Sequence, residues 1–124
     1  MEKIRHFSLT VTAADGTTAA VTVDQTGVNI PEGYTVKKIG IVQIANGGSD
    51  RYGLGVRDKQ NNEVIQNAHK SLRIASESTA IEDRYMSANL KGGKVYNPMI
   101  RNDVAPSGSD RVVEFEFIAY KDEE

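Results

Sequence analysis

Polar and apolar residues alternate along most of this chain with a period of two. Within residues 5–11, every second position holds Arg5, Phe7, Leu9 or Val11, and the positions between them hold His, Ser and Thr. The same alternation recurs within residues 17–24, 51–57 and 111–120. Successive side chains of a β-strand point to opposite faces, so this pattern predicts strands with one packed face and one face in water.

Short clusters of turn-forming residues separate these stretches. Asp15-Gly16 tolerates the positive φ of a tight turn and predicts a hairpin that joins the first stretch to residues 17–24. Further turns and loops are predicted where Gly, Pro, Asn and Asp gather, at residues 27–33, 46–49, 58–62, 92–93 and 102–110. Shorter strands are predicted at Val64-Ile65 and at residues 71–75.

The most apolar stretch, residues 34–45, is predicted to be a strand at the centre of the fold. Its second half, residues 39–44, is apolar on both faces, which predicts a strand covered on two sides. Gly40 within it indicates a bulge or a close backbone contact. Pro98 lies in the extended stretch 95–101 and has no N–H to donate to a neighbouring strand, so it predicts an edge strand there.

Residues 78–90 fit no single pattern. Thr79 and Glu82 have the spacing of a capping box, which would place Tyr85 and Met86 on one face of a short helix. The same residues could instead form an irregular excursion that pairs as an edge strand. We favour a loop with a short helical turn.

Composition narrows both the fold and the function. The chain has 124 residues, enough for one domain with its own core, and it contains no cysteine for disulfides or thiolate metal sites. No stretch is long and apolar enough for a transmembrane helix, and the alternating polar residues near the start favour a strand over a signal peptide. We therefore expect one soluble all-β domain, residues 1–124, folded as an antiparallel β-sandwich or jelly roll of about eight short strands.

Candidate catalytic and metal-binding groups are few. The two histidines, His6 and His69, have no spacing that suggests a zinc site. Glu114 and Glu116 could be a catalytic carboxylate pair, but their alternation with apolar residues favours the solvated face of a strand. No nucleophile elbow, phosphate-binding loop or EF-hand spacing occurs. We predict no catalytic site, no cofactor and no metal site, and leave open a weak Ca²⁺ site in the Asp- and Asn-rich turns.

Charge argues against nucleic acid as a partner. The net charge is −2, and Tyr52 is the only aromatic residue among the basic residues of the middle of the chain. Proteins that bind single strands usually interleave cations with aromatic side chains on which bases stack. We expect no nucleic-acid partner and no membrane partner.

Residues 78–101 are predicted to form much of a subunit interface. They hold two of the three methionines and two of the five tyrosines, and both types are enriched, with arginine, in interface cores. Arg84 is the predicted polar clamp, and the predicted anchors are Tyr85, Met86, Tyr96 and Met99. The alternative is that these side chains cap the end of the chain's own core.

A family resemblance also implies a protein that assembles with partners. Residues 30–72, IPEGYTVKKIGIVQIANGGSDRYGLGVRDKQNNEVIQNAHKSL, followed by the closing strand VVEFEFIAYK at residues 112–121, resemble small β-sandwich accessory proteins of bacteriophage virions. This resemblance implies a capsid-associated jelly roll that decorates or cements a capsid or forms a vertex. The implied location is the virion, and the implied partners are further copies of the chain and a capsid or other virion protein.

Three classes of function remain, in decreasing order of support. The first is a non-enzymatic structural or assembly protein that acts as a homo-oligomer. The second is a ligand-binding β-sandwich, for example a carbohydrate-binding module, but such modules display aromatic side chains and this chain has no Trp and 6% aromatic residues. An enzyme is the weakest of the three. The native mass of the protein separates the first two, because assembly requires a defined oligomer.

Overall fold

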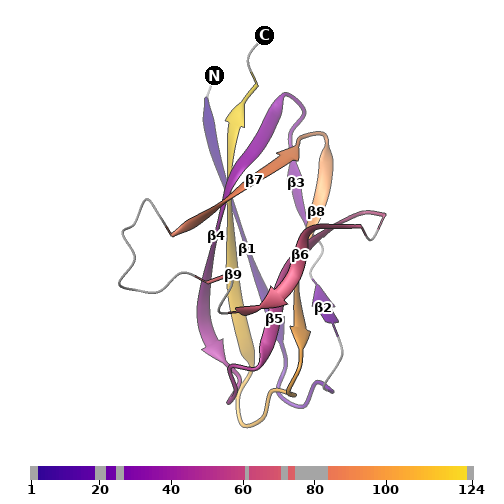
Figure 1. Ribbon diagram of the computed structural model, residues 1–124, viewed down its shortest axis with the longest axis vertical. Coiled ribbons are helices and arrows are strands. Elements are labelled where there is room, and N and C mark those ends of the chain that lie inside the picture. Colours follow the sequence, from indigo (N-terminus) through magenta and orange to yellow (C-terminus); the bar gives the residue numbers. More distant parts are fainter. Residues whose placement is uncertain are drawn as a thin grey trace.

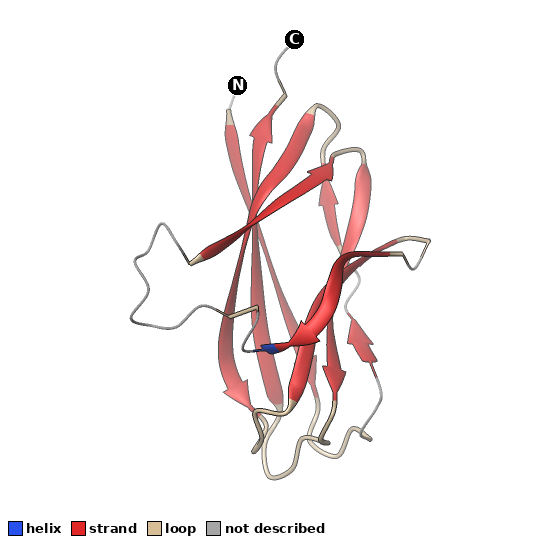
Figure 2. Cartoon of the chain, in the orientation of Figure 1, coloured by secondary structure: helices blue, strands red, loops and turns tan. Residues whose placement is uncertain are grey.

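The computed structural model describes residues 3–18, 22–24, 27–60, 62–70, 73–74 and 84–122. These residues form nine β-strands in two antiparallel sheets that face one another, and no α-helix occurs among them (Figure 2). The predicted all-β class is confirmed. Both ends of the described chain lie at the same end of the molecule (Figure 1).

Each sheet is built from strands that are distant in the sequence. The first sheet contains, in spatial order, β1 (Ile4–Ala13), β9 (Arg111–Lys121), β4 (Tyr34–Asn46) and β7 (Tyr85–Lys91). In the second sheet, β8 (Lys94–Asn102) lies beside β5 (Tyr52–Asp58), which pairs in turn with β6 (Glu63–His69). The other side of β8 is covered by β2 (Thr22–Asp24) and β3 (Val28–Ile30).

The pairing of the strands is that of one long hairpin wound into a roll. The first strand pairs with the last, β2 and β3 pair with β8, β4 pairs with β7, and β5 pairs with β6. Winding this nested set brings β9 beside β4 and β8 beside β5. Because β2 and β3 occupy one position, eight strand positions form the two sheets, which is the arrangement of a jelly roll.

The core lies between the two sheets, as the alternation predicts. On β9, Phe115 and Phe117 have no exposed surface, and Leu54 and Val56 of β5, in the other sheet, belong to the same core with none either. The strands predicted at residues 51–57 and 111–120 are confirmed, with their apolar positions inward.

The hairpin predicted after the first strand is wrong. Asp15-Gly16 does form a turn, in which Gly16 has a φ of 90° and the Thr17 N–H donates to the Ala14 carbonyl over 3.0 Å. However, β2 pairs with β8 in the second sheet, and β1 pairs with β9 along its whole length. A turn dipeptide fixes where the chain reverses and not which strand becomes the partner, so this turn carries the chain across to the other sheet.

The strand β4 is central for only half of its length. It pairs with β9 throughout, but among the described residues it pairs with β7 only from Thr35 to Gly40. Beyond that point Val42 is 60% exposed and Ile44 is 56% exposed, so the prediction that residues 39–44 are covered on both faces is wrong. The close contact predicted at Gly40 is confirmed, since a Cβ there would lie 2.6 Å from Cε1 of Tyr85.

Pro98 lies in a central strand rather than at the predicted edge. In β8 it stands opposite Val56 of β5. On its other side the neighbouring strand is interrupted, because β2 pairs only with residues 99–101 and β3 only with residues 94–96. The residue that lacks an N–H therefore lies where the second ladder is broken, which is how a central strand accommodates a proline.

Three further predictions are corrected. Val28–Ile30 forms β3 inside the predicted loop, and Tyr85–Lys91 forms β7 where a short helical turn was favoured. Glu63–His69 forms one strand, after which Arg73 and Ile74 form a turn on the Lys70 carbonyl. The rest of the predicted strand at 71–75, and residues 78–83 of the predicted excursion, lie outside the described residues.

Candidate functional site

The outward face of the β1-β9-β4-β7 sheet carries an ordered set of side chains. The antiparallel register places Ser8, Glu116, Gly40 and Tyr85 in one row across the four strands. In the next row Thr10, Glu114 and Val42 lie side by side, and among the described residues β7 adds no fourth member to this row. A hollow lined by Val42 lies at this place.

This hollow is a groove of about 500 Å³. Four groups of residues line it: Gly40 to Gln43 of β4, Glu114 and Glu116 of β9, Lys70 and Ile74 after β6, and Arg84 and Tyr85 at the start of β7. Tyr85 is held on one side of it by Gly40, because any larger residue there would meet the tyrosine ring. Apolar, acidic and basic side chains thus share one concave surface.

The charges in the groove are separated by strand. The two acids stand on β9, and Glu116 accepts a hydrogen bond over 3.0 Å from Nδ1 of His6 on the far side. Lys70 lies across the groove and forms an ion pair with Asp50, with 3.3 Å between Nζ and Oδ1. Between the two groups lies the exposed Val42, with Ile44 next on the same face of β4.

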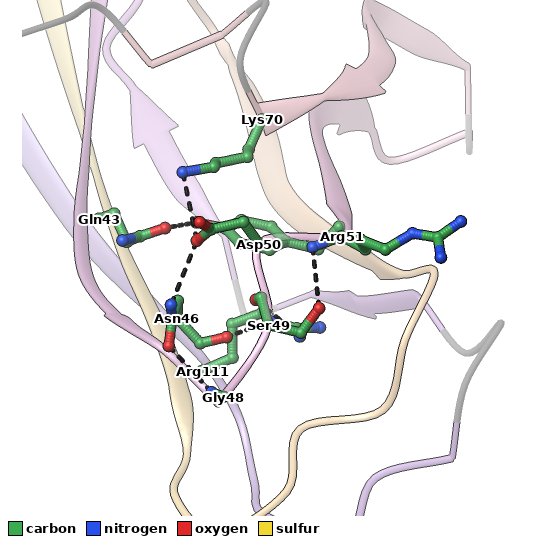
Figure 3. A network of polar contacts seen from close by, with 9 residues as sticks. Gln43, Asn46, Gly48, Ser49, Asp50, Arg51, Lys70 and Arg111 are labelled. Carbon is green, nitrogen blue, oxygen red and sulfur yellow. Dashed lines mark hydrogen bonds and ion pairs between the residues drawn. The ribbon is translucent and has the colours of Figure 1, made fainter.

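Behind the groove, a polar network closes the end of the sandwich opposite the termini (Figure 3). Its centre is Arg111, the first residue of β9, which has no exposed surface. Its guanidinium donates four hydrogen bonds of 2.8–3.2 Å to the carbonyls of Asn46, Ser49 and Val104 and to Oδ1 of Asn102. One side chain therefore joins the turn after β4 to the loop after β8.

Tyr52 connects this network to the groove. The Arg111 guanidinium lies 4.7 Å from the centre of the Tyr52 ring, and the Tyr52 hydroxyl donates a hydrogen bond to Oε1 of Gln43, which lines the groove. Burial raises the pKa of Tyr52 to about 12. Nearby, the hydrogen bond from Asn46 and then that from Lys70 lower the pKa of Asp50 below its ordinary value.

The charged centre of this region is already engaged by groups of the chain itself. Arg111 has no surface that a ligand could reach, and its four acceptors already occupy it. In the part of the chain that the structure describes, no three side chains of the His, Cys, Asp or Glu types come together to hold a metal ion. His6 and His69 lie on different sheets.

The structure separates the five predicted interface residues. Tyr96 and Met99 are only 3% and 2% exposed in the single chain, so they are not available to a partner in this state. Met86 is half-buried and packs against the core. Arg84 is exposed and Tyr85 half-buried, and both line the groove. The alternative reading, in which these side chains pack on the chain's own core, therefore describes Met86, Tyr96 and Met99.

Sequence reasoning missed two features of the site. Arg111 occupies the inward phase of the β9 alternation, which continues with Val113 and Phe115, and a charged residue in that phase was the available signal. Val42 and Ile44 were predicted to be covered, and nothing in the sequence showed that the described pairing of β4 with β7 reaches only to Gly40.

Comparisons of the chain with models of protein families, with curated proteins and with solved structures found no match. Among the described residues, no helix has the length and apolar character needed to cross a membrane.

Proposed function

We propose that this protein is a non-enzymatic structural protein that assembles with copies of itself through the outer face of the β1-β9-β4-β7 sheet. The observation that carries the proposal is the exposure of Val42 and Ile44, at 60% and 56%, on the outward face of β4, where the row of Val42 otherwise holds the polar Thr10 and Glu114. An antiparallel sheet normally turns polar residues to water and apolar ones to the core. Two neighbouring β-branched residues that break this rule indicate a surface that a partner covers.

The composition of the surroundings supports the same function. Complete burial of a Val or Ile side chain contributes about 1.5–3 kcal/mol, and here more than half of each side chain is still exposed to be buried. Tyr85 and Arg84 border the apolar pair, and tyrosine and arginine are the types that most often dominate the binding energy of interfaces. A face of this kind can supply the centre of an interface with charged groups around it.

We further propose that the assembly is a virion component, which decorates or cements a bacteriophage capsid or forms its vertex. The resemblance of residues 30–72 and 112–121 to phage accessory proteins supports this, and so does the jelly-roll winding, which many viral capsid domains share. Mass spectrometry of purified virions from the source of the gene tests it. Stoichiometric amounts of the chain in intact particles would support the proposal, and its presence only among free proteins would contradict it.

The native mass tests self-assembly directly. Native mass spectrometry of the parent is expected to give a defined oligomer, and the double variant Val42→Thr, Ile44→Thr should shift it toward the monomer. Threonine keeps the branched Cβ that strands favour and places a hydroxyl in the interface without a partner. Ile4→Thr is the matched control, because Ile4 is 46% exposed at the far end of the same face. A parent that stays monomeric at all concentrations contradicts the proposal.

A ligand-binding module is the second candidate, and the groove is the observation that favours it. Its volume of about 500 Å³ lies in the usual range for small-molecule sites, and an aromatic ring, two carboxylates and two cations line it. Titration with oligosaccharides, followed by NMR, distinguishes the two functions. A monomer that binds a saccharide and loses it in Tyr85→Ala would replace assembly as the function.

A further inference from the structure

The charges around Val42 are arranged on two sides of it. On one side, β9 places Glu114 directly opposite Val42 and Glu116 one row along, opposite Gly40. On the other side, Arg84 precedes β7 and Lys70 follows β6, and β6 and β7 are the outermost strands of their sheets at this edge. An apolar centre is thus flanked by two acids on one side and two bases on the other.

This layout allows the face to pair with its own copy across a two-fold axis. In a two-fold interface the same surface contacts itself after a rotation of half a turn. When the axis lies in the interface and runs along β4, each side of β4 meets the opposite side of β4 in the other copy. If the axis passes close to Val42, the acids on β9 of one copy face Arg84 and Lys70 of the other, and the reverse contact forms at the same time. Val42 then packs near its own symmetry mate.

We infer that the partner on this face is a second copy of the chain, docked with two-fold symmetry so that Glu114 and Glu116 of one copy meet Lys70 and Arg84 of the other. This inference rests on the proposed self-assembly and adds the partner, the symmetry and the pairing of charges. A surface in which all four charges had one sign would repel its own copy, whereas this one attracts it.

Docking of a second copy does not require the four charged side chains to be unpaired in the monomer. Lys70 is paired with Asp50 and Glu116 with His6, but Asp50 and His6 are themselves more than half exposed. Lys70 and Glu116 are themselves 22% and 35% exposed, and pairs with one partner largely in water contribute little. The docked copy therefore adds contacts to these side chains without first breaking a buried pair.

Charge reversal tests this pairing with two variants. Each variant alone should lose self-association, and a mixture of the two should regain it. The first variant carries Glu114→Lys and Glu116→Lys, and the second carries Lys70→Glu and Arg84→Glu. Alone, each presents one sign of charge to its own copy, so we expect its self-association, measured by analytical ultracentrifugation, to weaken at least tenfold. Mixed in equal amounts, the two have opposite flanks and should form the mixed dimer with close to the parent's affinity.

The control has the same change of net charge as the second variant, at a different place. Lys38→Glu with Lys91→Glu also replaces two exposed cations by acids on this face, but in rows away from Val42. This variant is expected to dimerise like the parent. Circular dichroism of all variants checks folding, and recovery of the mixed dimer is itself proof that both charge-reversed chains fold.

The outcomes separate this inference from the function on which it rests. A parent that does not self-associate overturns both. An oligomeric parent whose two charge-reversed variants associate unchanged keeps self-assembly and overturns this interface. Variants that each lose association but show no recovery when mixed overturn the two-fold pairing of charges.

Salt dependence gives a second test of the charge pairing. Raising the salt from roughly 0.1 M to 1 M shortens the Debye length from about 10 Å to 3 Å. The affinities of the parent dimer and of the mixed dimer should both fall, and an unchanged affinity would contradict the pairing.

Discussion

Two regions of this molecule break the usual distribution of polar and apolar groups, and they do so in opposite directions. At the end of the sandwich opposite the termini, a charged guanidinium is completely buried, whereas on the outer face of the first sheet two β-branched side chains are more than half exposed. The buried charge has its partners within the chain, since Arg111 donates to four oxygens. Val42 and Ile44 lack such cover. The first exception serves the fold, and we propose that the second serves association.

Arg111 is expected to give the largest effect on folding. Replacing it with methionine, which keeps much of the volume, leaves the Asn46, Ser49 and Val104 carbonyls without this donor. Unsatisfied buried acceptors each cost about 1–3 kcal/mol, so we expect the free energy of unfolding, measured in urea, to fall by roughly 3–5 kcal/mol.

Arg101→Met is the matched control for that experiment. Arg101 is partly exposed and forms an ion pair with Asp103 over 2.9 Å, so its replacement should change stability by about 1 kcal/mol or less. Equal effects of the two substitutions would contradict the structural role given to Arg111. Arg111→Lys should fall between them, because an ammonium group cannot span acceptors from both loops.

Tyr52 predicts a loss of stability at high pH. Its pKa is raised from 10.0 to about 12 in the folded chain, so between these values the folded state holds a proton that the unfolded state has lost. The stabilisation is complete below about pH 10 and decreases as the pH rises toward 12, by at most about 1.4 kcal/mol per pH unit.

The measurement compares the parent with Tyr52→Phe between about pH 9 and pH 12, because Phe removes this titration and leaves those of the other tyrosines. The difference in unfolding free energy between the two chains should shrink with increasing pH. A difference that stays constant would show that Tyr52 ionises equally easily in both states.

A substitution at Gly40 tests whether the missing side chain there allows Tyr85 to line the groove. An alanine Cβ there would lie 2.6 Å from Cε1 of Tyr85, so Gly40→Ala should destabilise the protein by about 1 kcal/mol as the ring shifts. In the background of Tyr85→Ala the same change should stabilise it by about 0.5 kcal/mol, since alanine orders a strand better than glycine. Additive effects in this double-mutant cycle would mean that the contact between the two residues is unimportant.

The sequence predicted what is local in this fold. Side-chain alternation is a property of a single strand, and it correctly placed Phe115 and Phe117 inward. The turn at Asp15-Gly16 was correctly predicted from the dipeptide itself. Which strands become neighbours depends on the winding of the whole chain. For that reason the predicted hairpin partner of β2 and the predicted edge position of Pro98 were wrong, although both residue stretches do contain strands.

The candidate site was less predictable than the fold because it depends on where one strand ends. Arg84 and Tyr85 were predicted at an interface and do lie at the groove, but Tyr96 and Met99 are core residues of β8. The same composition suits an interface and a core, since both are packed and desolvated. Val42 and Ile44 could be assigned to an exposed surface only once the register showed that the described pairing of β4 with β7 ends at Gly40 and Tyr85.

The smallest effect on folding is expected from Val42→Thr with Ile44→Thr. Both side chains are already largely exposed, and threonine keeps the strand preference, so the monomer's free energy of unfolding should change by about 0.5 kcal/mol or less.

The comparison with Arg111 predicts that the double substitution changes instead how the thermal midpoint depends on protein concentration. If copies associate only when folded, the parent's thermal midpoint rises with concentration, and that of the double variant should not. The Ile4→Thr control should behave like the parent. A double variant that unfolds several degrees lower at every concentration would mean that Val42 and Ile44 stabilise the single chain, and the contrast between the two regions would then disappear.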